Sequence, residues 1–250
     1  MPKDFKKQLR KLGLSNGDVV FMHSSMKALN TDKTPEEFIN DVISVIGREG
    51  TLLIPAFTWS NVNEEQPHFS ARETEPCDGL IPRRFLRMPG VVRSLHPTHS
   101  VGAFGKLAMK LISKHALDET PQGPNSPLTR LPEFNGKILF IGDILHSCSF
   151  MHSVEEIAQV PYVLAKKRVR YTIEDENGAA VEKEMIPHDF HGWGAEYGRV
   201  KKILKYPDIK KGKVGKAKCF LVDAAALLEK AIAVMKREPY YFVTDISKYI

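Results

Sequence analysis

Residues 18–58, DVVFMHSSMKALNTDKTPEEFINDVISVIGREGTLLIPAFT, predict the order strand, helix, strand on which the fold is built. Asp18–His23 and Gly50–Thr58 are apolar runs of strand length. Between them, Thr34-Pro-Glu-Glu37 is a capping box with proline at the first helical position, and apolar residues then recur at helical spacing until Gly47. Strands that alternate with helices indicate a layered α/β fold.

The same alternation continues outside this stretch. Lys137–Gly142 predicts a third strand, and Ala217–Val222 predicts a fourth, which leads into a helix capped by Asp223. Helices are also expected over residues 81–87 and from Lys106 to about Leu117.

Antiparallel strands are expected after Pro161. Arg168–Ile173 and Ala180–Ile186 form two strands around Glu176-Asn177-Gly178, a favoured tight turn. We therefore expect an α/β fold, a three-layer α/β/α sandwich around a mixed sheet. No repeat or linker divides the chain, so residues 1–250 are expected to form a single domain with a hairpin insertion near 166–187. The polar stretch 59–79 is expected to form a lid loop over a substrate cleft.

Composition narrows the class of protein. The chain has 250 residues, 42% of them hydrophobic, which is enough to bury a full core, and its net charge of +6 favours anionic partners. Cys77, Cys148 and Cys219 form no close pair, which argues against disulfides and cysteine zinc sites and favours a cytoplasmic protein. Residues 1–10 are charged and amphipathic, and no apolar run of leader or membrane-spanning length follows them.

Candidate catalytic residues lie in Ser147–Glu156, straight after the third strand. His152 precedes Glu155 by one helical turn, and a carboxylate bonded to one imidazole nitrogen raises the basicity of the other, as a general base requires. Spacing alone also allows an alternative, in which His152 and Glu155 make an ordinary contact on a solvated helix face. Ser149 is a helix cap or an oxyanion contact, and Cys148 is either a nucleophile or, as we favour, a buried turn residue.

Other histidines leave alternatives open. His96 and His99 flank Pro97, which disfavours a helical metal-binding face, so polar groups satisfied in a buried turn are the preferred interpretation. A metal-dependent hydrolase built on His96, His99 and His152 stays open, as does a basic nucleic-acid-binding protein using residues 201–218. For His188 and His191 a structural role is favoured over a place in an acceptor pocket.

Several blocks together resemble the aminoglycoside 3-N-acetyltransferase family. They occur in the family's order over about the first 160 residues, and the block with arginine-serine before histidine-proline-threonine-histidine-serine is the most specific. The blocks are His23–Leu29, Gly47–Thr58, Gly79–Pro82, Pro89–Gly105, Ser126–Leu128 and Cys148–Glu155. The last third of the chain is only loosely similar.

The resemblance implies an N-acyltransferase that moves an acetyl or similar acyl group from coenzyme A to an amine of an amino sugar, with no metal. By resemblance, His152 is the general base, Glu155 orients it, and Ser149 lies near the acyl carbon. The cofactor-lining residues implied in the same way are Ser24, Ser25, Met26, Arg93, Ser94, His99, Ser100 and Phe104. Implied partners are acyl-CoA and the amino sugar, with a homodimer as the assembly considered and with no nucleic acid and no membrane.

The acceptor stays open at this stage. Aminoglycosides are polycations and should select an acidic cleft, whereas this chain is basic overall. The family also includes relatives that acylate nucleotide-linked amino sugars, whose negative charge suits the surplus of lysine and arginine. The sequence leaves the acyl group, the acceptor and the oligomeric state undetermined.

Overall fold

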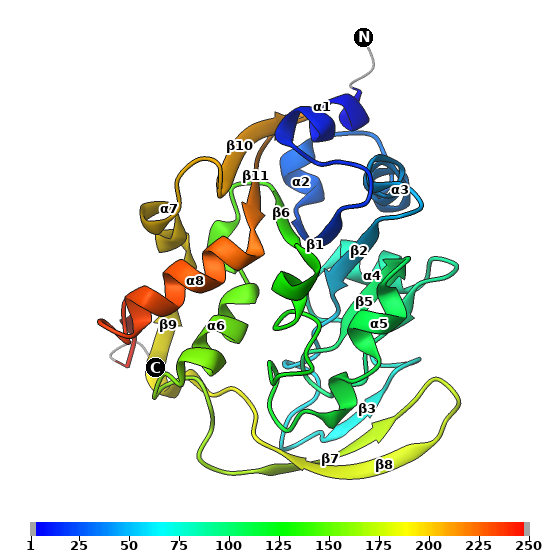
Figure 1. Ribbon diagram of the computed structural model, residues 1–250. Coiled ribbons are helices and arrows are strands. Elements are labelled where there is room, and N and C mark those ends of the chain that lie inside the picture. The colour runs from blue at the N-terminus through cyan, green and yellow to red at the C-terminus, as the bar shows by residue number, and fades with distance from the viewer. Residues whose placement is uncertain (1–3, 248–250) are drawn as a thin grey trace.

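The computed structural model describes residues 4–247 and is built on a seven-stranded mixed sheet with the order β10-β11-β6-β1-β2-β5-β4 (Figure 1). Its strands are β1 (Val19–Ser24), β2 (Thr51–Pro55), β4 (Val92–Arg93), β5 (Val101–Gly105), β6 (Lys137–Ile141), β10 (Ile209–Val214) and β11 (Ala217–Asp223). The central strand β1 pairs in parallel with β2 and β6, and the outer pairings are antiparallel. The predicted mixed sheet is confirmed.

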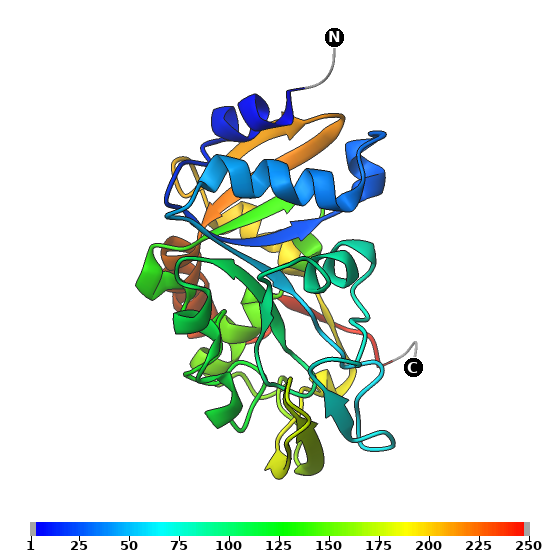
Figure 2. The ribbon, with the colours of Figure 1, turned by 90° about the vertical axis from the view of Figure 1, so that its right-hand side faces the viewer.

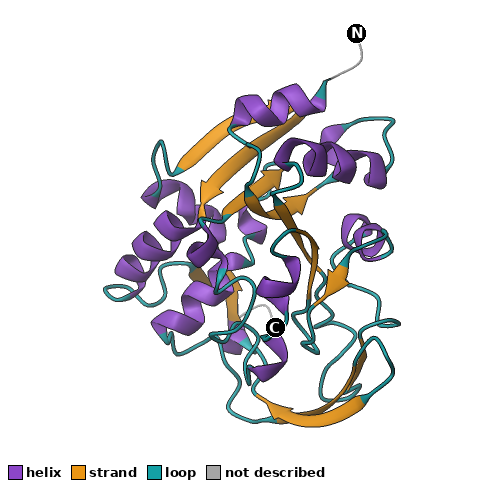
Figure 3. Cartoon of the chain, turned by 45° about the vertical axis from the view of Figure 1, so that its right-hand side comes forward, coloured by secondary structure: helices purple, strands orange, loops and turns teal. Residues whose placement is uncertain are grey.

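Helices cover both faces of this sheet (Figures 2 and 3). Along β1, Val20 and Met22 join one hydrophobic core while Val19 and Phe21 join the other, as the alternation of side chains along a strand requires. The first core contains side chains from α1 (Phe5–Leu12), α2 (Met26–Leu29), α3 (Pro35–Ile46) and α4 (Leu80–Leu86). The second contains side chains from α5 (Ala108–Ile112), α6 (Phe150–Ala158), α7 (Val200–Ile203) and α8 (Ala224–Met235). The predicted α/β/α sandwich is therefore confirmed.

Local sequence explains where α3 begins. The Thr34 hydroxyl accepts a hydrogen bond from the Glu37 backbone N–H, and the Glu37 carboxylate accepts one from Thr34. These two bonds satisfy donors that a helix start otherwise leaves unpaired. The apolar stripe then buries Phe38, Ile39 and Val42 against the sheet. Complete burial of side chains of this size stabilises the fold by about 1.5–3 kcal/mol each.

A second sheet of three strands lies below the first in Figure 1 and consists of β3 (His68–Ser70), β7 (Val169–Glu174) and β8 (Ala180–Met185). The predicted hairpin is present as β7 and β8. The stretch 59–79, which was expected to be a loop throughout, contains β3, because Phe69 is fully buried with Tyr171 in a third core. Strands β9 (Trp193–Ala195) and β12 (Val243–Asp245) form a separate pair.

One predicted helix is shorter than expected. Instead of running from Lys106 to Leu117, α5 ends at Ile112 and a 3-10 turn follows over His115–Leu117. The His115 side chain is fully buried and bonds to Ser94 and to the Pro121 carbonyl, which draws the chain off the helical path. Further 3-10 turns lie at Leu131–Phe134, Leu145–Ser147, Phe190–Gly192 and Tyr197–Arg199. Within residues 4–247 no helix is both long and apolar enough to cross a membrane.

Candidate active site

The predicted pair of His152 and Glu155 forms on α6. After β6 the chain passes through the turn at Leu145–Ser147 and enters α6, which places Glu155 in the core and His152 at its edge. His152 Nδ1 lies 3.1 Å from Glu155 Oε2, and the Glu155 side chain is fully buried. Because a carboxylate only accepts hydrogen bonds, Nδ1 carries the ring proton and Nε2 keeps a lone pair. The arrangement fits a general base.

Two tyrosines fix the Glu155 carboxylate. The Tyr197 hydroxyl donates to Glu155 Oε2 at 2.8 Å and lies 3.1 Å from His152 Nδ1. The Tyr162 hydroxyl donates to the other oxygen, Oε1, at 3.1 Å. Burial and the neighbouring Glu155 charge raise the pKa of both tyrosines, so both keep their protons at neutral pH. The carboxylate is therefore held in one orientation, facing the imidazole.

Two cavities meet α6 at successive turns. A cavity of about 810 Å³ is lined by His152, by His188 and His191, by Lys166 and Lys167, and by the segment 59–64. A cavity of about 260 Å³ on the other side is lined by Ser24, Ser25, Asp78 and Ser149. Ser149 and His152 are three residues apart, or about 4.5 Å along a helix axis. The two cavities therefore reach this helix within one turn of each other.

Ser149 occupies the N-cap position of α6 but does not act as the cap that its hydroxyl suggests. The Ser149 side chain makes no capping hydrogen bond, and its backbone N–H points to His23 Nε2 at 3.4 Å. The backbone at Ser149 is helical rather than extended, which turns the hydroxyl away from the first helical amides. Burial lowers the pKa of His23 to about 3, so this ring is neutral and accepts that bond.

Cys148 is a buried turn residue, as the sequence favoured. Its side chain is fully buried, and burial raises the pKa of the thiol to about 12. A thiolate is therefore absent near neutral pH, which argues against a cysteine nucleophile. All three cysteines are free, as predicted.

The residues that the family resemblance assigned to the cofactor lie in different parts of the site. Ser24 and Ser25 line the smaller cavity, and Ser25 caps α2, which begins at Met26, by accepting from Ala28 N. Arg93 and Ser100 instead bond to each other and to backbone carbonyls, with Arg93 Nε 2.9 Å from Ser100 Oγ. Burial of the Arg93 guanidinium lowers its pKa to about 10, so it stays charged. Of the remaining three, Ser94 bonds to His115, His99 lines the larger cavity and Phe104 is half-buried on β5.

The histidines that come together differ from the predicted trio. One ring nitrogen each of His99, His152 and His188 lies within 4.8 Å of the others, whereas His96 is not part of this cluster and stacks on His115. The trio of His96, His99 and His152 proposed for a hydrolase is therefore wrong, because the buried turn directs His96 inward, where its Nδ1 accepts from the backbone. His96 Nε2 has no partner within residues 4–247, so the buried turn satisfies this ring only in part.

Several site residues escaped sequence reasoning. Tyr162 and Tyr197 lie on the far side of Glu155 and carry no local motif. Asp78 lies near the end of the stretch predicted as a lid, accepts a bond from Phe57 N, and has its pKa raised to about 6 by burial. His188, whose structural role was favoured, lines the larger cavity and bonds through Nε2 to Glu156 at 2.7 Å. Only spatial proximity reveals these partners.

Known proteins resemble this chain along most of its length. A family model described as aminoglycoside 3-N-acetyltransferase matches residues 21–236. Aminoglycoside N(3)-acetyltransferase IX of Micromonospora chalcea is 29% identical over 258 residues, which cover 91% of this chain and 90% of that protein. The crystal structure of aminoglycoside acetyltransferase AAC(3)-Xa superposes with a TM-score of 0.82 at 26% identity, covering 94% of this chain and 92% of that one. The structure of AAC-IIIb, binary with CoASH, superposes with a TM-score of 0.79 at 25% identity, covering 93% and 95%.

Proposed function

This chain belongs to the aminoglycoside 3-N-acetyltransferase family, and we propose that His152 serves it as the general base. The family reaction moves an acetyl group from coenzyme A to an amine of an amino sugar, which makes the protein a coenzyme A-dependent N-acyltransferase. The family match does not favour a metal-dependent hydrolase or a nucleic-acid-binding protein.

The observation that carries the proposal is the buried Glu155 carboxylate 3.1 Å from His152 Nδ1. In our mechanism His152 Nε2 takes a proton from the acceptor amine as the amine nitrogen attacks the thioester carbonyl. Glu155 stabilises the imidazolium that forms. The carbon–sulfur bond then breaks, the coenzyme leaves as a thiolate, and the imidazolium returns the proton to it. No covalent acyl-enzyme is needed.

Coenzyme A is assigned to the smaller cavity and the amino sugar to the larger one. Ser24, Ser25 and Ser149 line the smaller cavity, and the Ser149 hydroxyl has no hydrogen-bond partner within residues 4–247. That hydroxyl is free to donate to the developing oxyanion. We further propose Met26, Arg93, Ser94, Ser100 and Phe104 as the remaining coenzyme A residues, with Arg93 and Ser100 acting through the backbone that they brace. His99, which the resemblance also assigned to the coenzyme, lines the larger cavity instead.

An aminoglycoside is the first acceptor to test, because the curated relative carries that activity in its name. Lys166 and Lys167 line the larger cavity together with Glu64 and Asp189, so an anionic group on the acceptor also has partners there. A nucleotide-linked amino sugar is therefore the second candidate. We also propose that residues 59–79 form a lid, since 59–64 line this cavity. We propose in addition that the enzyme is cytoplasmic and forms a homodimer. Sedimentation would test the dimer.

Replacement of His152 by alanine tests the base. Turnover should fall by about 10²–10⁴-fold, the usual contribution of general-base catalysis. Coenzyme A affinity, measured by calorimetry, should change little because His152 lies on the other cavity. His146→Ala is the control, since His146 is exposed in the turn before α6. Turnover of His152→Ala close to that of the control would exclude the assignment.

A further inference from the structure

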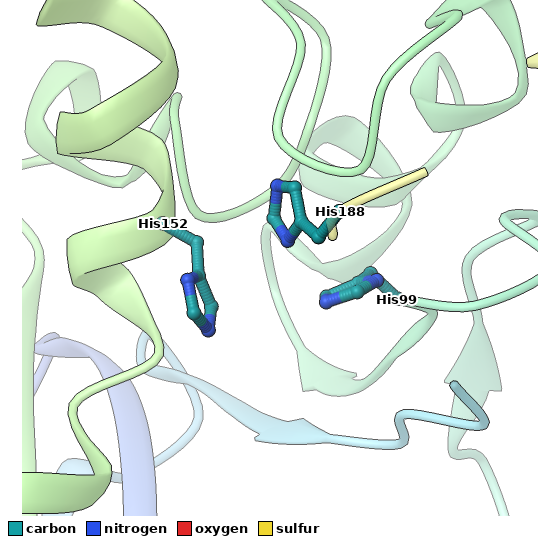
Figure 4. Close-up of side chains that lie close together, drawn as sticks. All are labelled: His99, His152 and His188. Atoms are coloured by element: carbon teal, nitrogen blue, oxygen red, sulfur yellow. The ribbon is translucent and has the colours of Figure 1, made fainter. Parts of the chain in front are cut away.

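Three histidines from separate parts of the chain face one space in the larger cavity (Figure 4). His152 comes from α6, His99 from the turn before β5, and His188 from the segment after β8. The ring centroid of His188 lies 4.8 Å from the ring centroid of His99 and 5.0 Å from that of His152. One nitrogen of each ring lies within 4.8 Å of a nitrogen of each other ring. The acyl transfer described above uses only one of the three rings.

Each ring has one nitrogen held by a protein group. His152 Nδ1 contacts Glu155, His188 Nε2 contacts Glu156 at 2.7 Å, and His99 Nδ1 contacts the Thr98 hydroxyl at 2.9 Å. The opposite nitrogen of each ring has no hydrogen-bond partner among the described residues, and His188 Nδ1 is also buried. Metal-bound histidines show this pattern, in which a carboxylate or another acceptor orients the ring from behind.

The three imidazole nitrogens also determine which ions suit the site. Neutral imidazole is a ligand for zinc, copper and nickel, whereas magnesium and calcium prefer oxygen. Lys166 and Lys167 line the same cavity and oppose a cation, while the carboxylates of Glu155 and Glu156 behind the rings attract it.

We propose that His99, His152 and His188 form a binding site for a divalent zinc-like ion, with the fourth position open to the larger cavity. Zinc–nitrogen bonds of about 2.1 Å in a tetrahedron place ligand nitrogens about 3.4 Å apart. The ring nitrogens, now within 4.8 Å of one another, therefore close by about 1.4 Å at most on binding. Rotation of side chains that border an open cavity provides this movement.

The ion inhibits acyl transfer, and this consequence rests on the proposed role of His152. A metal on His152 Nε2 occupies the lone pair that must take the proton from the amine. The open fourth position also lies where the acceptor amine approaches. Zinc therefore competes with the amino sugar and leaves the smaller cavity accessible to coenzyme A.

Metal binding is tested first without substrates, on protein that carries no affinity-tag histidines. Titration with Co²⁺ should give the visible absorption of a tetrahedral site at one ion per chain, and Zn²⁺ should displace it. His188→Ala and His99→Ala should abolish the absorption. Glu156→Gln should weaken zinc binding by about 10–100-fold, as loss of an orienting carboxylate does. His191→Ala is the matched control, because both nitrogens of this cavity-lining ring are already paired.

Turnover is then measured with and without Zn²⁺ for each variant. Inhibition at the zinc concentration that displaces Co²⁺, reversed by chelator and weakened in His188→Ala, supports the proposal. Absence of stoichiometric binding, or equal binding by His188→Ala and His191→Ala, would overturn the site and leave the role of His152 standing. Binding at the three histidines without inhibition would overturn the inhibitory role and count against His152 as the base.

Discussion

Substitution of Glu155 by glutamine should lower turnover by about a thousandfold. When His152 takes the proton, its ring gains a positive charge opposite the buried carboxylate, whose Oε2 lies 3.1 Å from Nδ1. With charge centres about 4 Å apart and an effective dielectric constant of about 20, that attraction amounts to about 4 kcal/mol. Glutamine removes it, and about 4 kcal/mol corresponds to about 10³ in rate.

Glutamine suits this test because it matches glutamate in size and keeps one oxygen, so that one of the two tyrosine hydroxyls that donate to Glu155 retains its acceptor. Its amide can also donate to His152 Nδ1, which would move the ring proton to Nε2 and remove the base directly. Thiol release from acetyl-CoA in the presence of an aminoglycoside gives kcat and KM across pH. Thermal unfolding shows whether the variant folds.

The neighbouring Glu156→Gln variant is the comparison, because it makes the same change in a pair that holds His188 rather than His152. We expect a reduction in kcat below about tenfold, since that imidazole takes no proton in the reaction. If Glu156→Gln lowered kcat more than Glu155→Gln, or if both left kcat unchanged, the assignment of His152 and Glu155 would be refuted.

Three further predictions concern the thiol, pH and helix capping. Cys148→Ala should keep turnover within about threefold, since a buried thiol is no nucleophile; a loss of catalysis with intact folding would argue otherwise. Burial lowers the pKa of His23 to about 3 and of His115 to about 4, while unfolded histidine titrates near about 6.5. Below about pH 6.5 the unfolded chain therefore binds more protons than the folded one. The contribution of these two histidines to the free energy of unfolding is complete above about pH 6.5 and falls by about 1.4 kcal/mol per histidine per pH unit down to about pH 4. Asp78 and Glu156, whose pKa burial raises to about 6, oppose this loss below about pH 6. Denaturant unfolding at several pH values measures the net slope, and a stability that rises as the pH falls from about 6.5 contradicts the prediction. Thr34→Ala should lower the free energy of unfolding by about 1 kcal/mol in the same assay, because it removes the capping bond to Glu37.

Sequence reasoning found the parts of the fold that depend on local chemistry. The capping box at Thr34, the buried strands β1, β2 and β6, and the hairpin around Gly178 each carry their own signal of spacing or turn residues. It missed α1, β10 and the strand β3. Phe69 lies in a polar stretch, and only the β7 partner makes that segment a strand.

The contacts of the site likewise include some that local spacing predicts and others that join distant segments. The contact between His152 and Glu155 is local, because residues three apart share a helix face, and it was predicted. The contacts of Tyr162 and Tyr197 with Glu155 join distant segments, and no spacing along the chain encodes them. Family resemblance supplied the role of the pair, but it did not supply these supporting residues.

The adjacent glutamates Glu155 and Glu156 pair with two different histidines because of the geometry of the helix. Successive residues on a helix point about 100° apart, so Glu155 and Glu156 cannot both serve His152. Glu155 turns inward to His152, while Glu156 leaves at a different angle and meets His188, 32 residues further along the chain. One helical turn thus orients two imidazoles from behind and directs both to the same cavity. The geometry that makes one ring a base therefore also brings a second ring within reach of a shared metal ion.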